Sequence, residues 1–250
     1  MNITVFFKKI CLLALACALI FSCLSCNENN NSTPETPEKN KHTYPTVIID
    51  AGHGGEDCGA IGINGIYEKD INLSIALELQ AMLEANGIPT RLTRETDVLL
   101  YDKNADYHGK KKLLDMQARR AIINQYTDAI FISIHMNSFP EQKYSGLQVY
   151  YSPSMENSRI LAQFIQDTVR SNLQYENERK IKSSEDDIYL LNEAIHPSVL
   201  VECGFLSNRE ECELLSQTAY QKRLTLCIYT AIINYFTSAQ NNKNNNESNT

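Results

Sequence analysis

The chain has 250 residues, of which 43% are hydrophobic and 21% are charged, so it can bury a full core. Its formal net charge is −7, and it becomes −9 without the first 25 residues, whose only charged side chains are Lys8 and Lys9. This acidic balance argues against a nucleic-acid-binding protein, which normally has a basic face. Four of the eight cysteines fall in the first 26 residues, which leaves too few for a disulfide framework. The sequence leaves open whether the other four are free or paired: Cys58, Cys203, Cys212 and Cys227.

The N-terminus has the pattern of an export signal. Lys8 and Lys9 precede an apolar run over residues 10–21, which is too short to span a bilayer comfortably as a helix. A buried amphipathic helix is the alternative, but this run is apolar all round and leads into a polar segment. Residues 1–25 are therefore predicted to be a signal peptide, and we expect the protein to be exported to the cell envelope or periplasm.

A cysteine follows small residues at the end of this signal. The Leu24-Ser25-Cys26 end resembles a bacterial lipoprotein signal, in which the cysteine receives a lipid and becomes the mature N-terminus. The resemblance implies lipidation at Cys26, with Cys23 after Ser22 as the alternative. It also implies a lipid anchor that holds the protein to a membrane.

Two polar segments flank the part of the chain that can fold. Residues 26–43 and 240–250 are rich in Asn and other polar residues and contain scarcely an apolar side chain. Such segments bury too little surface to offset their conformational entropy, so they are predicted to be a disordered tether and a disordered tail. Residues 44–239 are expected to form one domain.

The first half of this domain alternates strand and helix patterns. Residues 46–50 are a short β-branched run, which is typical of a buried strand. After a glycine-rich loop, residues 68–86 carry apolar side chains at helical spacing and end before Gly87, which favours a left-handed stop. Residues 89–93 predict a second strand. The long polar connection over 95–114 indicates a functional loop.

The second half continues the alternation. Asp115 is predicted to cap a helix that runs to Tyr126. Further strands are predicted over residues 129–134, 147–151, 189–191 and 199–203, and further helices over 155–173, 207–215 and 218–236. Strands alternating with helices predict an α/β three-layer domain with helices on both faces of a largely parallel sheet.

Polar residues follow three of the predicted strands. His53 comes just after the first strand, His135 follows the strand over 129–134, and Glu202 ends the last strand. Ligand sites in open α/β sheets form outside the carboxyl ends of the strands, so these side chains are expected to lie close together. Glu68, which opens the first helix, lies near the end of the loop that His53 begins.

Two imidazoles and one carboxylate are a ligand set that catalytic Zn²⁺ uses, with the fourth position left to water. Glu202 would then be spare to take a proton from water and return it to a leaving amine. Each residue also has a structural alternative: either His alone is more often a hydrogen-bonded structural residue, and Glu68 also suits a helix N-terminus. Glu202 is harder to explain in that way, because an acidic group in a buried strand end needs a partner.

These segments resemble the zinc-dependent N-acetylmuramoyl-L-alanine amidases of bacterial cell-wall turnover, which cut the bond between the glycan lactyl group and the stem peptide. The matching stretches are IDAGHGG at 49–55, GAIG at 59–62 with EKD at 68–70, LTR at 92–94, SIHMNS at 133–138 and LVECGFLSN at 200–208. Their order and spacing run through nearly the whole predicted domain.

The resemblance implies one Zn²⁺ held by His53, Glu68 and His135, with Glu202 as the catalytic carboxylate and peptidoglycan as the substrate. It also implies a mixed α/β sheet of about six strands. Arg94 is a candidate to orient a carboxylate of the substrate, although a surface salt bridge is an equal alternative. Asn137 is a candidate to hold a ligand or the substrate by a hydrogen bond.

Some members of that family carry an inserted helix that plugs the site until a partner removes it. Here residues 138–146 connect directly to the next strand and leave no room for such a plug. We therefore expect no self-inhibition by that device, and residues 95–114 are the better candidate for a lid or a substrate contact. The need for a protein activator stays open.

Two rival functions remain at this point. One is a zinc peptidase or deacetylase acting on another cell-envelope amide, which the ligand types alone do not exclude. The other is a non-catalytic wall-binding lipoprotein on a retired hydrolase fold, although such a protein would usually have lost a metal ligand or the base.

Overall fold

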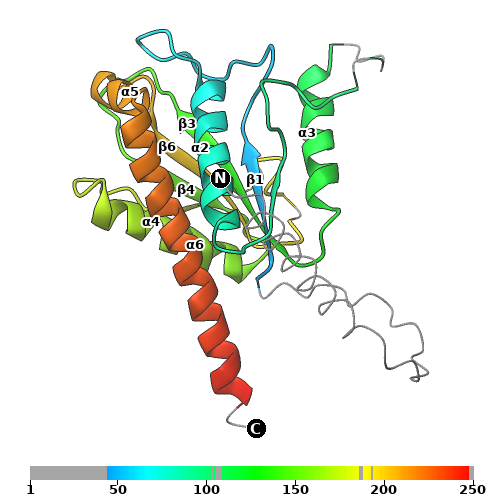
Figure 1. The fold of residues 1–250 in the computed structure, drawn as a ribbon. Helices are drawn as coiled ribbons and strands as arrows, with labels where there is room; N and C mark the ends of the chain where they lie inside the picture. The colour runs from blue at the N-terminus through cyan, green and yellow to red at the C-terminus, as the bar shows by residue number, and fades with distance from the viewer. Residues whose placement is uncertain (1–43, 103, 105–108, 186–187, 193, 248–250) are drawn as a thin grey trace, which may run out of the picture. The chain divides into compact units, whose positions relative to one another are not determined.

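The computed structural model describes residues 44–102, 104, 109–185, 188–192 and 194–247 (Figure 1). The strands are β1 (Thr46–Ala51), β2 (Thr90–Leu92), β3 (Ala129–Asn137), β4 (Gln148–Tyr151), β5 (Lys182–Ser183) and β6 (Ser198–Phe205). The helices are α2 (Glu68–Glu84), α3 (Lys111–Ile123), α4 (Glu156–Asn172), α5 (Arg209–Leu215) and α6 (Thr218–Glu247). The predicted signal peptide and tether lie outside the described residues, and so do Cys23 and Cys26.

The strands form one sheet of six in the order β2-β1-β3-β6-β4-β5. Strands β1, β2, β3 and β6 run parallel to one another, β4 runs antiparallel to β6, and β5 runs parallel to β4. The sheet is therefore mixed and mostly parallel, which confirms the predicted fold class. One consequence matters for the site: the carboxyl ends of β1, β3 and β6 and the amino ends of β4 and β5 meet at the same edge.

Alternate residues of the central strands pack against different layers. Val47 and Ile49 of β1 belong to the core under α2, α4 and α6, whereas Ile48 packs with Phe131 and Ile123 on the α3 side. Figure 1 shows α2, α4 and α6 together on one side of the sheet and α3 on the other. Strands covered on both faces are apolar throughout, which explains why β1 and β3 read as continuous β-branched runs rather than as alternating ones.

Two predicted elements differ from the structure. Helix α3 begins at Lys111, so Asp115 lies inside the helix and does not cap it. Residues 189–191 form a turn, in which the amide of Leu191 bonds the carbonyl of Ile188 at 2.9 Å, and not a strand. These residues are apolar because they pack on the α3 side of the sheet: Leu190 and Leu191 are buried in the same hydrophobic cluster as Ile48, Ile123 and Phe131. The strand in this part of the chain is β5, which is too short and polar to give a sequence signal.

Helix α6 is longer than the sequence pattern predicts. It continues to Glu247, through most of the Asn-rich segment that was expected to be disordered from residue 240. Extending an existing helix adds one hydrogen bond per residue fixed, whereas starting one is costly, so a packed helix can continue into residues of poor helix propensity. Within the described part of the chain, no helix is both long and apolar enough to cross a membrane.

Candidate metal centre and active site

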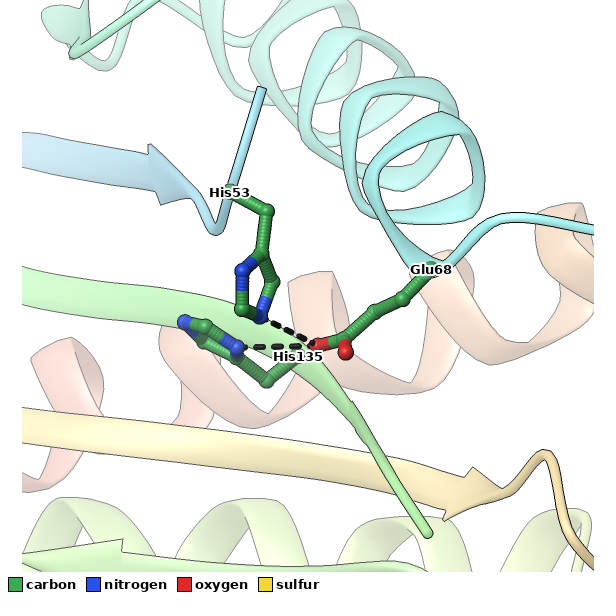
Figure 2. Close-up of side chains that lie close together, drawn as sticks. All are labelled: His53, Glu68 and His135. Atoms are coloured by element: carbon green, nitrogen blue, oxygen red, sulfur yellow. Dashed lines mark hydrogen bonds and ion pairs between the residues drawn. The ribbon is translucent and has the colours of Figure 1, made fainter. Parts of the chain in front are cut away.

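Three of the predicted site residues meet at the carboxyl edge of the sheet (Figure 2). His53 lies two residues beyond β1, His135 lies near the end of β3, and Glu68 is the first residue of α2. One nitrogen from each imidazole and one oxygen of the carboxylate all lie within 4.8 Å of one another. His53 and His135, which were selected as strand-end residues, therefore lie together with Glu68 at the start of α2, and all three can bind one metal ion.

Glu68 lies at the centre of this group and is only 3% exposed. Its Oε1 is 3.2 Å from Nε2 of His53 and 2.9 Å from Nδ1 of His135. Its Oε2 accepts a hydrogen bond from the amide of Ala60 at 2.8 Å. Burial raises the pKa of Glu68, but the hydrogen bonds and positive charges of the two imidazoles outweigh it and hold the pKa far below its usual range. A carboxylate ionised in this way has the charge that a cation site needs.

His53 is held in a rare backbone conformation, with φ of 63°. Its Nδ1 lies 2.9 Å from Oδ2 of Asp57, which directs Nε2 toward Glu68. Burial lowers the pKa of His53, but the hydrogen bonds to Asp57 and Glu68 outweigh it and raise the pKa to about 9. The site thus attracts positive charge. Asp57 was not identified from the sequence. The only signal that the sequence offered was an acidic residue in the loop that follows His53.

Arg119 of α3 fixes the backbone that carries His53. Its guanidinium is fully buried and pairs with Asp50 at 2.6 Å and with Asp115 at 2.7 Å. It also donates to the carbonyls of Ala51 at 2.8 Å and His53 at 2.6 Å. Charge-assisted hydrogen bonds of this kind are strong and directional, so they hold the loop in its strained shape. Nothing in the sequence pattern of α3 predicted this role.

Arg94 supports the same loop and does not face the substrate. It is 3% exposed, and its Nε donates to the carbonyl of Ala51 at 2.8 Å. Its Nη2 donates to the carbonyls of Gly52 at 2.9 Å and Lys69 at 2.8 Å. The prediction that Arg94 orients a substrate carboxylate is therefore wrong, as is its surface salt-bridge alternative, because backbone carbonyls already occupy the buried guanidinium.

Two glycines lie directly against the side chains of His135 and Glu68 and leave room for them. A Cβ on Gly52 would lie 2.3 Å from the His135 ring, and one on Gly59 would lie 2.5 Å from Oε2 of Glu68. Any larger residue would displace a ligand side chain. The donor set of two imidazoles and one carboxylate, the ionised Glu68 and this close cradle together fit a Zn²⁺ ion.

Glu202 lies beside this group on β6, directly paired with His135 of β3 in the sheet register. Its Oε2 is buried and has no hydrogen-bond partner among the described residues. Burial raises the pKa of Glu202 to about 7, and the charge of Glu68 adds to the rise although His135 opposes it. A carboxylate with a pKa near neutrality and a free buried oxygen is suited to exchange protons with a substrate.

Two further predicted features fall around the site. Asn137 ends β3, and its backbone carbonyl accepts a hydrogen bond from Leu206 at 2.8 Å; the role of its side chain stays a prediction. Cys203 is fully buried, and burial raises the pKa of its thiol, in agreement with a small packing residue. The four cysteines of the described chain are all free thiols: Cys58, Cys203, Cys212 and Cys227.

The start of the predicted loop over 95–114 packs against the glycine-rich loop. Oδ1 of Asp97 accepts a hydrogen bond from the amide of Gly55 at 2.7 Å, and its Oδ2 pairs with Lys69 at 2.6 Å. This segment therefore packs beside the loop that carries His53, and its role as a lid or a substrate contact stays a prediction.

Comparisons with known proteins agree with this geometry. A family model described as N-acetylmuramoyl-L-alanine amidase (Amidase_3) matches residues 47–234. A germination-specific N-acetylmuramoyl-L-alanine amidase of Bacillus subtilis (strain 168) is 38% identical over 192 residues, which cover 76% of this chain and 79% of the relative.

Solved structures give the same result. The CwlD amidase from Clostridioides difficile, solved in complex with the GerS lipoprotein, is 40% identical and covers 78% of this chain and 99% of its own, with a TM-score of 0.74. The amidase AmiC2 of Nostoc punctiforme is 31% identical and covers 77% of this chain and 97% of its own, with a TM-score of 0.66. The chain belongs to the N-acetylmuramoyl-L-alanine amidase family and is a hydrolase that acts on peptidoglycan.

Proposed function

We propose that the amidase is zinc-dependent and that one Zn²⁺ is held by His53, Glu68 and His135. This proposal is carried by one observation: Oε1 of Glu68 lies 3.2 Å from Nε2 of His53 and 2.9 Å from Nδ1 of His135. Two histidines and a carboxylate leave one position open, as catalytic zinc sites require. Asp57 acts on the metal through His53, because it fixes which ring nitrogen faces the site.

Zinc, when bound, polarises the carbonyl under attack and lowers the pKa of water. Glu202 takes one proton from the attacking water as the new C–O bond forms. It then delivers that proton to the nitrogen of L-alanine as the C–N bond to the lactyl group breaks. The buried, unpartnered Oε2 of Glu202 supports this role, because it has no competing hydrogen bond within the described part of the chain.

We also propose that the protein works from a membrane. Residues 1–25 would direct export, Cys26 would carry the lipid, with Cys23 as the alternative, and residues 26–43 would form the tether. Peptidoglycan lies outside the cytoplasmic membrane, so an exported and anchored enzyme meets its substrate. Because the short connection over 138–146 leaves no room for a plugging helix, we expect no self-inhibition by such a helix, and the need for a protein activator stays open.

The test is digestion of intact peptidoglycan by the chain without residues 1–26, with zinc or with a chelator, followed by mass analysis of the released fragments. We expect free stem peptides that begin with L-alanine, released only with metal. Fragments cut at another bond would indicate a different envelope hydrolase. Equal release with the chelator would refute zinc dependence, and turnover only after a second protein is added would contradict the expected absence of self-inhibition.

A further inference from the structure

Arg179 lies on the catalytic edge of the sheet although it is distant in sequence from every site motif. It precedes β5, which runs parallel to β4 at the margin of the sheet. Gln148 of β4 pairs directly with Glu202 of β6, and its side chain donates to the carbonyl of Lys180 at 2.9 Å. The segment that carries Arg179 therefore borders the strand end that carries the proposed proton carrier.

The guanidinium of Arg179 is held over an aromatic ring. Its Cζ lies 4.7 Å from the centroid of Phe205, which ends β6 three residues after Glu202. Its Nε is buried and has no hydrogen-bond partner among the described residues. Stacking on a ring restricts the guanidinium to a plane, and its two Nη groups make no hydrogen bond or ion pair among the described residues, so they are the donors that a ligand can reach.

No ion pair neutralises this cation within the described part of the chain. Arg94 and Arg119, by contrast, are bound by backbone carbonyls or by carboxylates. Burial raises the pKa of the neighbouring Glu211, and the charge of Arg179 only partly opposes this rise. The two oxygens of Glu211 accept hydrogen bonds from the amides of Gly146 at 2.9 Å and Phe205 at 2.8 Å, and not from Arg179. Partly buried charges normally have a partner of opposite sign, so Arg179 has the features of an anion-binding residue.

The substrate carries an anion close to the bond that is cut. The stem peptide has L-alanine at the bond that is cut, and the next residue is acidic, with a free carboxylate that amidated peptidoglycan replaces by a carboxamide. One extended residue spans about 3.3–3.6 Å, so this carboxylate lies within a few ångströms of the leaving nitrogen. Arg179 lies at the edge of the same site: the neighbouring Lys180 bonds Gln148, which pairs with Glu202, and the charge of Arg179 acts on that carboxylate.

We propose that Arg179 binds the free carboxylate of the second stem-peptide residue and makes the amidase prefer acidic over amidated stem peptides. This inference rests on the amidase function proposed above. A guanidinium binds a planar carboxylate through two parallel hydrogen bonds, whereas a carboxamide offers one acceptor and carries no charge. Arg179 would thus bind the substrate carboxylate, which is the role that was predicted for Arg94 from the sequence.

A different role would be positioning, in which the charge of Arg179 acts only through Glu202. The two roles give different kinetics. Positioning would lower kcat for every substrate alike, because Glu202 serves each of them. Substrate binding would affect only the substrate that carries the carboxylate.

The experiment uses two synthetic muramoyl peptides that differ only in a carboxylate or a carboxamide on the second residue. We expect the wild-type chain without residues 1–26 to have a kcat/KM roughly 10- to 100-fold higher for the acidic peptide, as one charged hydrogen-bonded pair predicts. Arg179→Gln should remove this preference by raising KM for the acidic peptide alone. Lys180→Gln, at an exposed neighbouring cation, should keep the preference.

Equal rates of the wild type on both peptides would overturn the proposal, and so would an equal loss on both in Arg179→Gln. If Arg179→Gln does not fold, Arg179→Met replaces it, because methionine keeps an apolar contact with Phe205. Bound zinc is measured for every variant. If the wild type is active without zinc, the zinc proposal is wrong. The ratio of the kcat/KM values on the two peptides still tests the role of Arg179 separately.

Discussion

At the scale of single residues, the site contains two glutamates in opposite electrostatic environments. Glu68 lies between two imidazoles, which hold its pKa far below the usual range despite burial. The Oε2 atom of Glu202 is buried with no hydrogen bond among the described residues, and burial raises the pKa of Glu202 to about 7. When the surroundings shift the pKa values of two titratable groups in opposite directions, one group stays ionised and the other can exchange protons, which is typical of active sites. Glu68 is suited to bind a cation, and Glu202 to move protons.

Glu202→Gln tests this division. Glutamine has nearly the same shape but cannot take a proton, so we expect kcat to fall by about 10²- to 10⁴-fold while zinc content stays unchanged. His53→Ala, by contrast, should lose zinc as well. Turnover on peptidoglycan fragments and metal analysis of the same samples provide the measurement, and near-normal turnover by Glu202→Gln would exclude the proton-transfer role.

Asp57→Asn tests how the metal ligand is oriented. The carboxylate of Asp57 holds Nδ1 of His53 at 2.9 Å, and loss of such a support typically costs 10- to 100-fold in metal affinity. We expect a loss of about that size in zinc titrations against a competing chelator. Glu56→Gln is the matched control, because Glu56 is an exposed neighbour that pairs with Lys111 outside the site. An unchanged affinity in Asp57→Asn would show that His53 needs no such support.

At the scale of elements, helix α3 and strand β1 are joined by a buried network that shapes the site. Arg119 of α3 pairs with Asp50 of β1, which also accepts hydrogen bonds from Ser133 at 2.6 Å and Thr93 at 2.7 Å. Burial raises the pKa of Asp50, but Arg119 and these hydroxyls outweigh it and lower the pKa to about 2. The network thus ties the carboxyl end of β1 to both neighbouring strands and to the helix.

This network predicts how stability depends on pH. The pKa of Asp50 is lower in the folded state, so its contribution is complete above the unfolded value of 3.8 and is lost as pH falls toward about 2. The total is on the order of 2 kcal/mol. Urea unfolding of the wild type and Asp50→Asn at pH 7 and pH 3 measures it: the gap between the two free energies of unfolding should narrow at pH 3. A constant gap would mean that Asp50 contributes no pH-dependent stability.

At the scale of the whole molecule, the candidate active site and the point where the chain enters the domain lie at opposite ends of β1. The site forms after Ala51, where β1 ends, whereas the chain enters the domain at Tyr44, before β1 begins at Thr46. A flexible tether over residues 26–43 would have an average span of about 20–25 Å. An anchored domain would therefore leave its active edge free to meet the wall.

Cys26→Ser tests the anchor separately from the chemistry. We expect the full-length variant to leave the membrane fraction while its rate on soluble peptidoglycan fragments stays unchanged, because the site is formed by residues far along the chain. Cys23→Ser is the paired variant, and it should remain in the membrane fraction. If Cys23→Ser leaves the membrane fraction and Cys26→Ser stays, the lipid is attached to Cys23. If both variants stay in the membrane fraction, lipid attachment at either cysteine is contradicted.

Much of the fold follows from local residue patterns. The apolar runs of β1, β3 and β6 and the helical spacing of α2 each identify an element, because periodicity and burial are linked within a few neighbouring residues. Histidines at the ends of two strands and a glutamate at the start of α2 identify the candidate metal group, since parallel strands bring their carboxyl ends to one edge. Family motifs strengthened the same assignment.

Other features depend on contacts between distant segments. The partners of Asp57, Arg94 and Arg119, the short strand β5 and the length of α6 leave no periodic mark in the sequence, because each is decided by which surfaces meet after folding. Arg94 and Arg179 illustrate the difference. Both are arginines near a strand, yet only tertiary packing occupies the first with carbonyls and leaves the second over Phe205 without an anionic partner among the described residues.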